Sequence, residues 1–187
     1  MITQVLLFCA IAYLIGAIPF ALIIGKLFYN TDIRTMGSGN LGTTNTFRCL
    51  GKKAGVMVFI LDISKGIVAT FLPTLSLGKV EFLSIFGAFA MIGHVYPIFA
   101  NFKGGKAVAT TVGVFTVLVP KALLLAAVVF FVIFAVTRYV SVSSITAAIS
   151  LPIFIFFLYW DVPYTIFGGI IAILIIVKHK SNIQRLL

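Results

Sequence analysis

Residues 122–138 read ALLLAAVVFFVIFAVTR, an apolar run that ends on a basic residue. Its length approaches the roughly 20 residues that a helix needs to cross the hydrocarbon core of a bilayer. Other stretches share this character, and together they predict seven spans at 4–28, 54–77, 81–100, 106–120, 122–138, 142–159 and 163–179. We therefore expect an all-α, polytopic integral membrane helical bundle, with residues 1–187 forming a single membrane-embedded domain.

The composition excludes a soluble globular protein. Of the 187 residues, 61% are apolar and 10% are charged, whereas a soluble domain is about 45–50% apolar and about 25% charged. The 14 Lys and Arg residues against four acidic residues give a formal charge of +10. In a membrane protein this excess reflects cytoplasmic loops or anionic ligands, so we expect no nucleic-acid partner.

The basic residues alternate between the boundaries of the spans. Eleven of the 14 lie at every second boundary, whereas the other boundaries hold only Lys79 and Lys121, and Lys65 lies inside a span. By the positive-inside rule, this predicts the N-terminus outside, the C-terminus in the cytoplasm and an odd number of crossings. Span 106–120 is the weak one, because its apolar part, Ala107 to Pro120, is about 14 residues and rises only about 21 Å, so it crosses thinly or re-enters.

The polar residues concentrate at the boundaries that we place in the cytoplasm. The first such segment, residues 37–48, reads GSGNLGTTNTFR. Its glycines allow several backbone N–H groups to point at one anion, and Arg48 supplies a bidentate charge. A flexible loop would use the same residue types. The predicted phosphate ligands here are Gly37, Ser38, Gly39, Asn40, Gly42, Thr43, Thr44, Asn45 and Arg48.

A second polar segment, residues 101–111, reads NFKGGKAVATT and places two lysines around a glycine pair just before a predicted helix. A helix start with nearby lysines suits a phosphate, although lysines that only extend to the membrane surface would look the same. The predicted binding residues are Lys103, Gly104, Gly105 and Lys106. His94 lies before them in its span, where a buried neutral His bonded to a neighbouring helix is the commoner explanation. Pro97 should bend or end that helix.

Two further basic boundaries carry weaker candidates. Ser141 and Ser143 begin the sixth span, where they could bind a phosphate or cap a helix. His179 and Asn182 lie three residues apart in the basic C-terminal segment, on one face of a helix, in a stretch that a stop-transfer anchor would also explain.

Asp62 and Lys65, three residues apart inside the second span, are costly within a bilayer unless they are paired. We interpret them as an internal ion pair; the alternative is that Asp62 orients the loops of the site.

The polar boundaries together describe a pocket for polyanions. Asp32 is the one carboxylate in these loops, so we expect no metal, and the sequence indicates no other cofactor. No local pattern of a catalytic Cys or of a Ser-His-Asp set is recognisable.

Three motifs occur in order along the chain: G-S-G-N-x-G-x-T-N-x-x-R, then G-H-x-x-P-I-F…F-K-G-G-K-A-V-A-T, then H-x-x-N-I-x-R-L. Together they closely resemble the signature segments of the bacterial acyl-phosphate:glycerol-3-phosphate acyltransferases, the PlsY family. The resemblance implies a multi-pass enzyme of the bacterial inner membrane with its active site at the cytoplasmic face. Such an enzyme transfers an acyl group from acyl phosphate to the 1-hydroxyl of glycerol 3-phosphate, giving lysophosphatidic acid and phosphate for phospholipid synthesis. The resemblance also implies functional roles for Ser38, Arg48, Lys103–Lys106, His179 and Asn182.

We expect a monomer whose partners are the lipid bilayer and the two substrates. The resemblance also leads to a mechanistic hypothesis. The amides of residues 37–42, Ser38 and one lysine would hold acyl phosphate, while Arg48, the other lysine and Asn182 would hold glycerol 3-phosphate. The base would be His179, His94 or, as we prefer, a phosphate oxygen of the donor. The competing class is a membrane transporter or channel for phosphate-containing anions. A metal-dependent phosphotransferase would need an aspartate-rich motif that is missing from this sequence.

Overall fold

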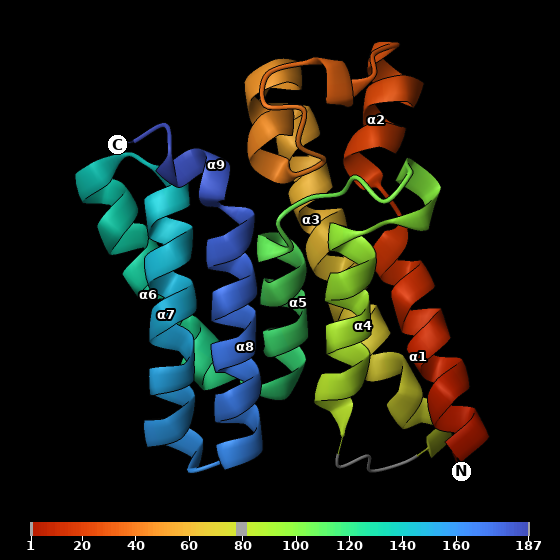
Figure 1. Ribbon diagram of the computed structural model, residues 1–187, viewed down its shortest axis with the longest axis vertical. Coiled ribbons are helices and arrows are strands. Elements are labelled where there is room, and N and C mark those ends of the chain that lie inside the picture. The colour runs from red at the N-terminus through yellow and green to blue at the C-terminus, as the bar shows by residue number, and fades with distance from the viewer. Residues whose placement is uncertain (1, 78–81, 187) are drawn as a thin grey trace. The chain divides into compact units, whose positions relative to one another are not determined.

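The structure, a computed structural model, describes residues 2–77 and 82–186, and every regular element in these ranges is a helix (Figure 1). The chain divides into two compact units, residues 1–117 and 118–187, and each is described by itself. The predicted start of the third span at residue 81, the outer-boundary residue Lys79 and the last residue, Leu187, lie outside the described residues.

The first unit is a bundle of apolar helices with two short 3₁₀ turns. Helix α1 packs against α3 and α4, and α2 packs against α3. Helices α1 and α4 cross closely because Gly16 and Gly93 have no Cβ; a Cβ at either position would overlap the backbone of the opposite helix. Gly66 and Gly113 allow α3 and α5 to approach closely for the same reason. The elements of this unit are α1 (Ile2–Ala17), α2 (Phe20–Tyr29), η1 (Ile33–Thr35), α3 (Thr43–Leu77), α4 (Leu83–Val95), η2 (Ile98–Ala100) and most of α5 (Val108–Leu118).

Two of these helices differ from the spans predicted by hydropathy. The first span is broken between α1 and α2, because Pro19 has no N–H and its ring obstructs a continuous helix. The second span begins early, at Thr43, and kinks at Gly51, whose φ of 85° and ψ of −179° lie outside the helical region. As predicted, α4 ends at Val95, just before Pro97.

One buried cluster of the first unit includes residues of its polar loops. Ile33 from η1 is fully buried and Leu41 is 4% exposed, so both ends of the loop before α3 are anchored. They pack with Ala21, Leu22, Ile24, Ala54, Val58 and Ala100. This cluster fixes where the first motif leaves the bundle.

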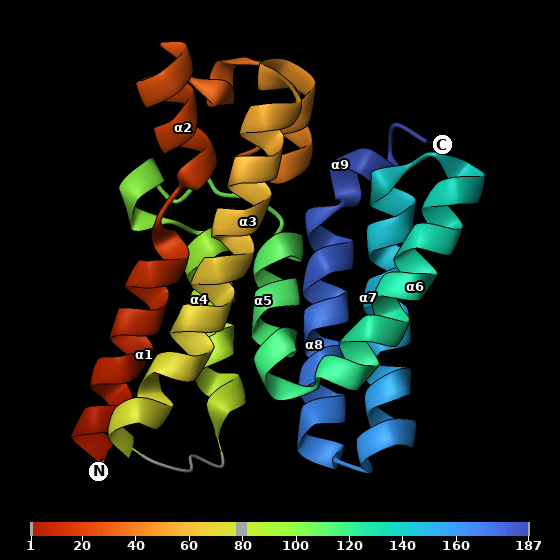
Figure 2. The same ribbon diagram turned by 180° about the vertical axis from the view of Figure 1, so that it is seen from behind.

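The second unit contains α6 (Pro120–Thr137), α7 (Val140–Tyr159), α8 (Val162–Lys178) and the short α9 (Lys180–Ile183). Helix α7 packs against both α6 and α8. Left-handed Arg138 and Trp160 cap α6 and α7, and the Asp161 carboxylate caps α8 by accepting from the Tyr164 N–H. The α6–α7 connection and the C-terminus lie at the same end of this unit (Figure 2).

The helices suit a membrane. Within the described residues, 5 helical segments are long and apolar enough to cross it: Ile2–Tyr29, Thr43–Leu77, Leu83–Ala100, Pro120–Thr137 and Val140–Tyr159. Helices α5 and α8 are shorter apolar helices. Many large apolar side chains face outward, including Leu6, Phe131 and Val136, which is 79% exposed. An integral membrane bundle explains this surface.

Candidate active site

The loops that carry the first two motifs lie at the same end of the first unit, away from the N-terminus (Figure 1). One loop joins α2 to α3 and contains η1; the other joins α4 to α5 and contains η2.

The first motif is built around the buried amide of Asn45. Its Oδ1 accepts from the Ser38 N–H at 2.9 Å and from the Ser38 hydroxyl at 3.1 Å. Its Nδ2 donates to the Met36 carbonyl at 3.1 Å and lies 3.4 Å from that of Ile33. Asn45 is 3% exposed. Asn45 therefore holds the fold of the loop, and its role as a substrate ligand stays a prediction.

The loop is shorter than the sequence suggested, and more of its backbone N–H groups already donate hydrogen bonds within the protein. Gly37 and Gly39 have φ values of 57° and 67°, which favour glycine. The N–H groups of Ser38 and Gly39 already bond inside the protein, to Asn45 Oδ1 and to the Met36 carbonyl. The segment expected to be a loop through residue 48 becomes helical at Thr43, because residues 43–48 contain no Gly or Pro that would interrupt a helix.

The remaining residues of the first motif lie around this turn and on the first turns of α3. Ser38, Thr44 and Arg48 are exposed, and Asn40 and Gly42 are half-buried. The Thr43 hydroxyl oxygen is buried and has no hydrogen-bond partner among the described residues. Half-buried Cys49 lies one turn after Asn45, with its Sγ 3.7 Å from the Asn45 Oδ1.

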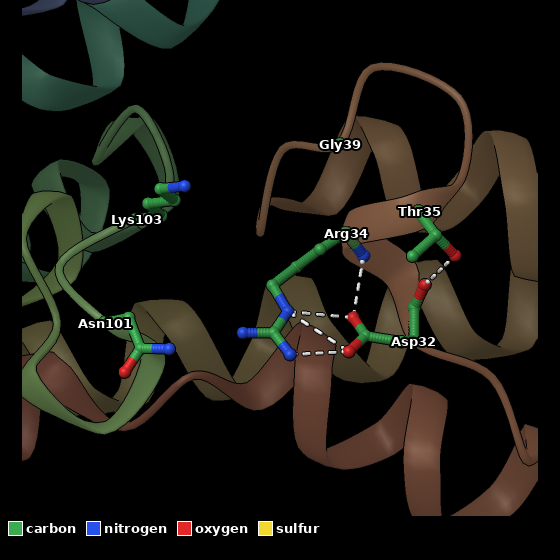
Figure 3. Close-up of a pocket in the computed structure, with 6 residues that line it drawn as sticks. All are labelled: Asp32, Arg34, Thr35, Gly39, Asn101 and Lys103. Atoms are coloured by element: carbon green, nitrogen blue, oxygen red, sulfur yellow. Dashed lines mark hydrogen bonds and ion pairs between the residues drawn. The ribbon is translucent and has the colours of Figure 1, made fainter.

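A polar pocket of about 390 Å³ opens between the two loops of the first unit (Figure 3). Arg34 lies on one side of it, and Asn101 and Lys103 reach toward it from the other loop. Its lining residues are Asp32, Arg34, Thr35, Gly39, Asn101 and Lys103.

An ion pair sets the charge of this pocket. The Arg34 guanidinium contacts the Asp32 carboxylate at 2.6 Å through Nη2 and at 2.9 Å through Nε. These side-chain hydrogen bonds, followed by the bond from the Arg34 backbone N–H, lower the pKa of Asp32 to about 2. Asp32 in turn raises the pKa of Arg34. The Asp32–Arg34 pair is neutral as a whole. Lys103 therefore gives the pocket a net positive charge, which suits an anion.

The glycine pair of the second motif is packed against the end of α4. The Gly105 N–H donates to the His94 carbonyl at 3.1 Å. A Cβ on Gly105 would overlap the His94 ring, and one on Gly104 would overlap the His94 carbonyl. These glycines therefore permit close packing of the segment that holds Lys103, which is exposed, and Lys106, which is half-buried. Helix α5 begins just after them, as predicted.

The predicted ion pair inside the second span is confirmed. Lys65 Nζ lies 2.7 Å from Asp62 Oδ1, and both side chains are almost completely buried. His94 Nδ1 lies 3.7 Å from the same carboxylate oxygen. Asp62 and His94 thus lie beneath the second motif and away from the surface of the pocket.

In the second unit, Ser143 and the C-terminal pair have structural partners. The Ser143 hydroxyl donates to the Tyr139 carbonyl at 2.9 Å, but no side chain caps the N-terminus of α7, and Ser141 is half-buried. His179 is buried at the junction of α8 and α9, with Nδ1 2.8 Å from the Ile175 carbonyl. A carbonyl can only accept, so Nδ1 carries a proton. The Asn182 N–H donates to the His179 carbonyl at 2.8 Å, in the first turn of α9, whose N-cap is His179.

The motifs agree with a known family. The family described as glycerol-3-phosphate acyltransferase has a model that matches residues 6–187. The chain belongs to the glycerol-3-phosphate acyltransferase family. This confirms the resemblance inferred from the three motifs.

Relatives of this acyltransferase family match along almost the whole chain. The glycerol-3-phosphate acyltransferase of Macrococcus caseolyticus is 50% identical over 98% of this chain and 94% of its own length. The one from Geobacillus kaustophilus is 49% identical over 95% and 89%.

Two solved structures also match: the glycerol 3-phosphate form and the lysophosphatidic acid form of PlsY (YgiH), an integral membrane glycerol 3-phosphate acyltransferase. The first gives a TM-score of 0.90 at 43% identity and the second 0.88 at 42%. Each comparison covers 97% of this chain and 90% of the PlsY chain.

Four pocket residues of this acyltransferase family member were not among the sequence candidates: Asp32, Arg34, Thr35 and Asn101. Arg34 lies in the first polar boundary and Asn101 begins the second polar segment, but neither was predicted to bind substrate. The available signal was the spacing of Asp32 and Arg34, since two opposite charges two residues apart are close enough to form an ion pair.

Proposed function

We propose that the protein is a membrane glycerol-3-phosphate acyltransferase that uses acyl phosphate as its donor. It transfers the acyl group to the 1-hydroxyl of glycerol 3-phosphate, and the products are lysophosphatidic acid and phosphate. The observation that carries this activity is the family match over residues 6–187. The basic pocket that Arg34, Asn101 and Lys103 line supports it, because both substrates present a phosphate to such donors.

The proposed topology has seven spans, with the N-terminus outside and both basic loops of the first unit in the cytoplasm. The support is the distribution of the 14 Lys and Arg residues together with the apolar helices. The membrane is the bacterial inner membrane, and the enzyme acts there as a monomer. Both units form one acyltransferase domain, since a single family model spans them.

The proposed reaction needs little chemistry from the protein beyond positioning and charge. The 1-hydroxyl oxygen attacks the acyl carbonyl carbon, the bond from that carbon to the phosphate oxygen breaks, and phosphate leaves with the hydroxyl proton. A phosphate oxygen with a pKa near 6 suits this base at neutral pH.

The residues assigned to the substrates come from the three motifs and the pocket. Lys103, Lys106 and Arg48 supply positive charge, and Ser38 is assigned from the first motif. Asn101 and Arg34 add donors at the pocket wall. His179 and Asn182 are assigned from the third motif. Near-normal turnover by His179→Ala, together with no turnover by Ser38→Ala, would favour the donor phosphate over His179 as the base.

The deciding experiment measures phosphate release and lysolipid formation by the purified protein in lipid or detergent. Acyl phosphate and glycerol 3-phosphate are supplied together and then each alone. We expect both products only when both substrates are present. In parallel, an acyl thioester of coenzyme A or of acyl carrier protein replaces acyl phosphate. Lysolipid from a thioester alone would overturn the donor assignment, and no lysolipid from any donor would overturn the activity.

A further inference from the structure

The buried charges of the first unit join three elements that are far apart in the sequence. Lys65, on α3, donates from Nζ to the Ile18 carbonyl at 3.0 Å, at the break between α1 and α2. Its ammonium also lies 5.6 Å from the centre of the Phe20 ring. The same ammonium pairs with Asp62. One lysine thus ties the broken first span to the second.

The carboxylate of Asp62 extends this connection to α4. Its Oδ1 lies 2.7 Å from Lys65 Nζ and 3.7 Å from His94 Nδ1. His94 is 6% exposed, so its ring is held between α3 and the loop that follows α4. A buried charged group without such partners would be strongly disfavoured at this depth.

The opposite side of His94 supports the second motif. Its carbonyl accepts from the Gly105 N–H, and its ring fills the space that a Cβ on Gly105 would need. Lys103 and Lys106 flank this glycine pair, so the position of the ring limits where both lysines can lie. Of the two, Lys103 lines the polar pocket.

We infer that Asp62, Lys65 and His94 form a positioning cluster that sets the affinity of the pocket for glycerol 3-phosphate by fixing the Lys103–Lys106 segment. This inference rests on the proposed function. The three residues act through the glycine pair and do not contact the substrate.

The first test removes both charges at once, so that neither is left buried alone. In Asp62→Asn/Lys65→Met we expect the KM for glycerol 3-phosphate to rise about tenfold or more while kcat changes less than about threefold, because a displaced lysine weakens binding. The control is Thr70→Val, which removes a buried hydroxyl on α3 whose hydrogen bond stays within the helix, to the Gly66 carbonyl. We expect its KM to stay at the wild-type value. A fall in kcat at unchanged KM would indicate a general structural role and overturn the inference.

The second test examines the contact between the ring and the glycine. Gly105→Ala should raise KM because its methyl group overlaps the His94 ring. Adding His94→Ala should recover part of that loss, since the ring is then gone. If the effects of the two substitutions on KM simply add, the ring and the glycine are not coupled, and the inferred contact is overturned.

Calorimetric binding of glycerol 3-phosphate separates this inference from the proposed function. Absence of wild-type turnover with every donor would overturn the activity, whereas unchanged binding by Asp62→Asn/Lys65→Met would overturn the positioning role alone. Weaker binding by this variant, with Thr70→Val unchanged, supports the positioning role.

Discussion

At the scale of single residues, the fold of the first motif depends on Asn45. Asn45→Ala removes hydrogen bonds to Ser38 and Met36 and takes this partner away from partly buried backbone groups. We expect a loss of about 1–3 kcal/mol in the free energy of unfolding, together with a large fall in activity. Thermal unfolding and phosphate release measure the two effects. Thr116→Ala, at an exposed position of α5 whose hydroxyl bonds only within its own helix, to the Val112 carbonyl, is the control and should leave both unchanged.

The pocket lysine is the second residue whose role can be measured. Lys103→Ala should raise the KM for glycerol 3-phosphate about 10- to 100-fold, since a hydrogen bond to a charged group contributes about 1.5–3 kcal/mol. Lys103→Arg should retain more affinity than Lys103→Ala. Lys52→Ala, which removes another exposed lysine of the same unit, is the matched control. If Lys52→Ala and Lys103→Ala raise KM equally, Lys103 acts only as a general surface charge and not as a ligand in the pocket.

The Asp32–Arg34 pair predicts a pH dependence. The folded protein lowers the pKa of Asp32 from its ordinary 3.8 to about 2. Its stabilising contribution is therefore present above about pH 4 and is lost as the pH falls toward 2. We expect the Tm difference between wild type and Asp32→Asn to be constant from pH 7 to 5 and to shrink only below about pH 4. A difference that already disappears near pH 6 would show that another group controls it.

At the scale of elements, hydropathy predicted where most helices lie but not where they break. The ends of α6, α7 and α8 follow the predicted spans closely, because apolar runs and their polar boundaries determine them. The break at Pro19 and the kink at Gly51 escape hydropathy, since both depend on backbone geometry. The role of Asn45 could not be foreseen either, because its partners come together only when η1 packs onto the core.

The kink at Gly51 sets the direction of the helical turns that carry Arg48. Its φ of 85° is strained for any other residue, and nothing lies within 4 Å of an added Cβ. Gly51→Ala should therefore cost about 1–3 kcal/mol through the backbone alone and lower activity. Gly169→Ala, in α8, also has open space around it but a helical backbone, and should be neutral or stabilising by up to about 1 kcal/mol. Thermal unfolding of the two variants compares the effects directly, and equal Tm values would contradict the strain.

At the scale of the whole molecule, the proposed topology can be tested by labelling. Cys9 and Cys49 are first replaced by alanine, and single cysteines are then introduced as Lys121→Cys and Ser181→Cys. In intact cells we expect a membrane-impermeant maleimide to label position 121 and not position 181, with the reverse in inverted vesicles. Labelling of position 181 from outside would reverse the orientation. Retained activity of the cysteine-free protein is the control for its fold.

The short helix α5 has a consequence for how lipid substrates travel. Its 11 residues rise about 17 Å, little more than half of an approximately 30 Å hydrocarbon core. At least one of its ends therefore lies at the depth of the acyl chains, and the second motif leads directly into it. In the proposed topology, with the Leu118 end near the outer surface, the helix would place the proposed phosphate-binding segment below the lipid headgroups. A single-tailed donor could then reach the pocket, and its product leave, by lateral diffusion within one leaflet, and encounters would scale with the surface density of donor in the membrane.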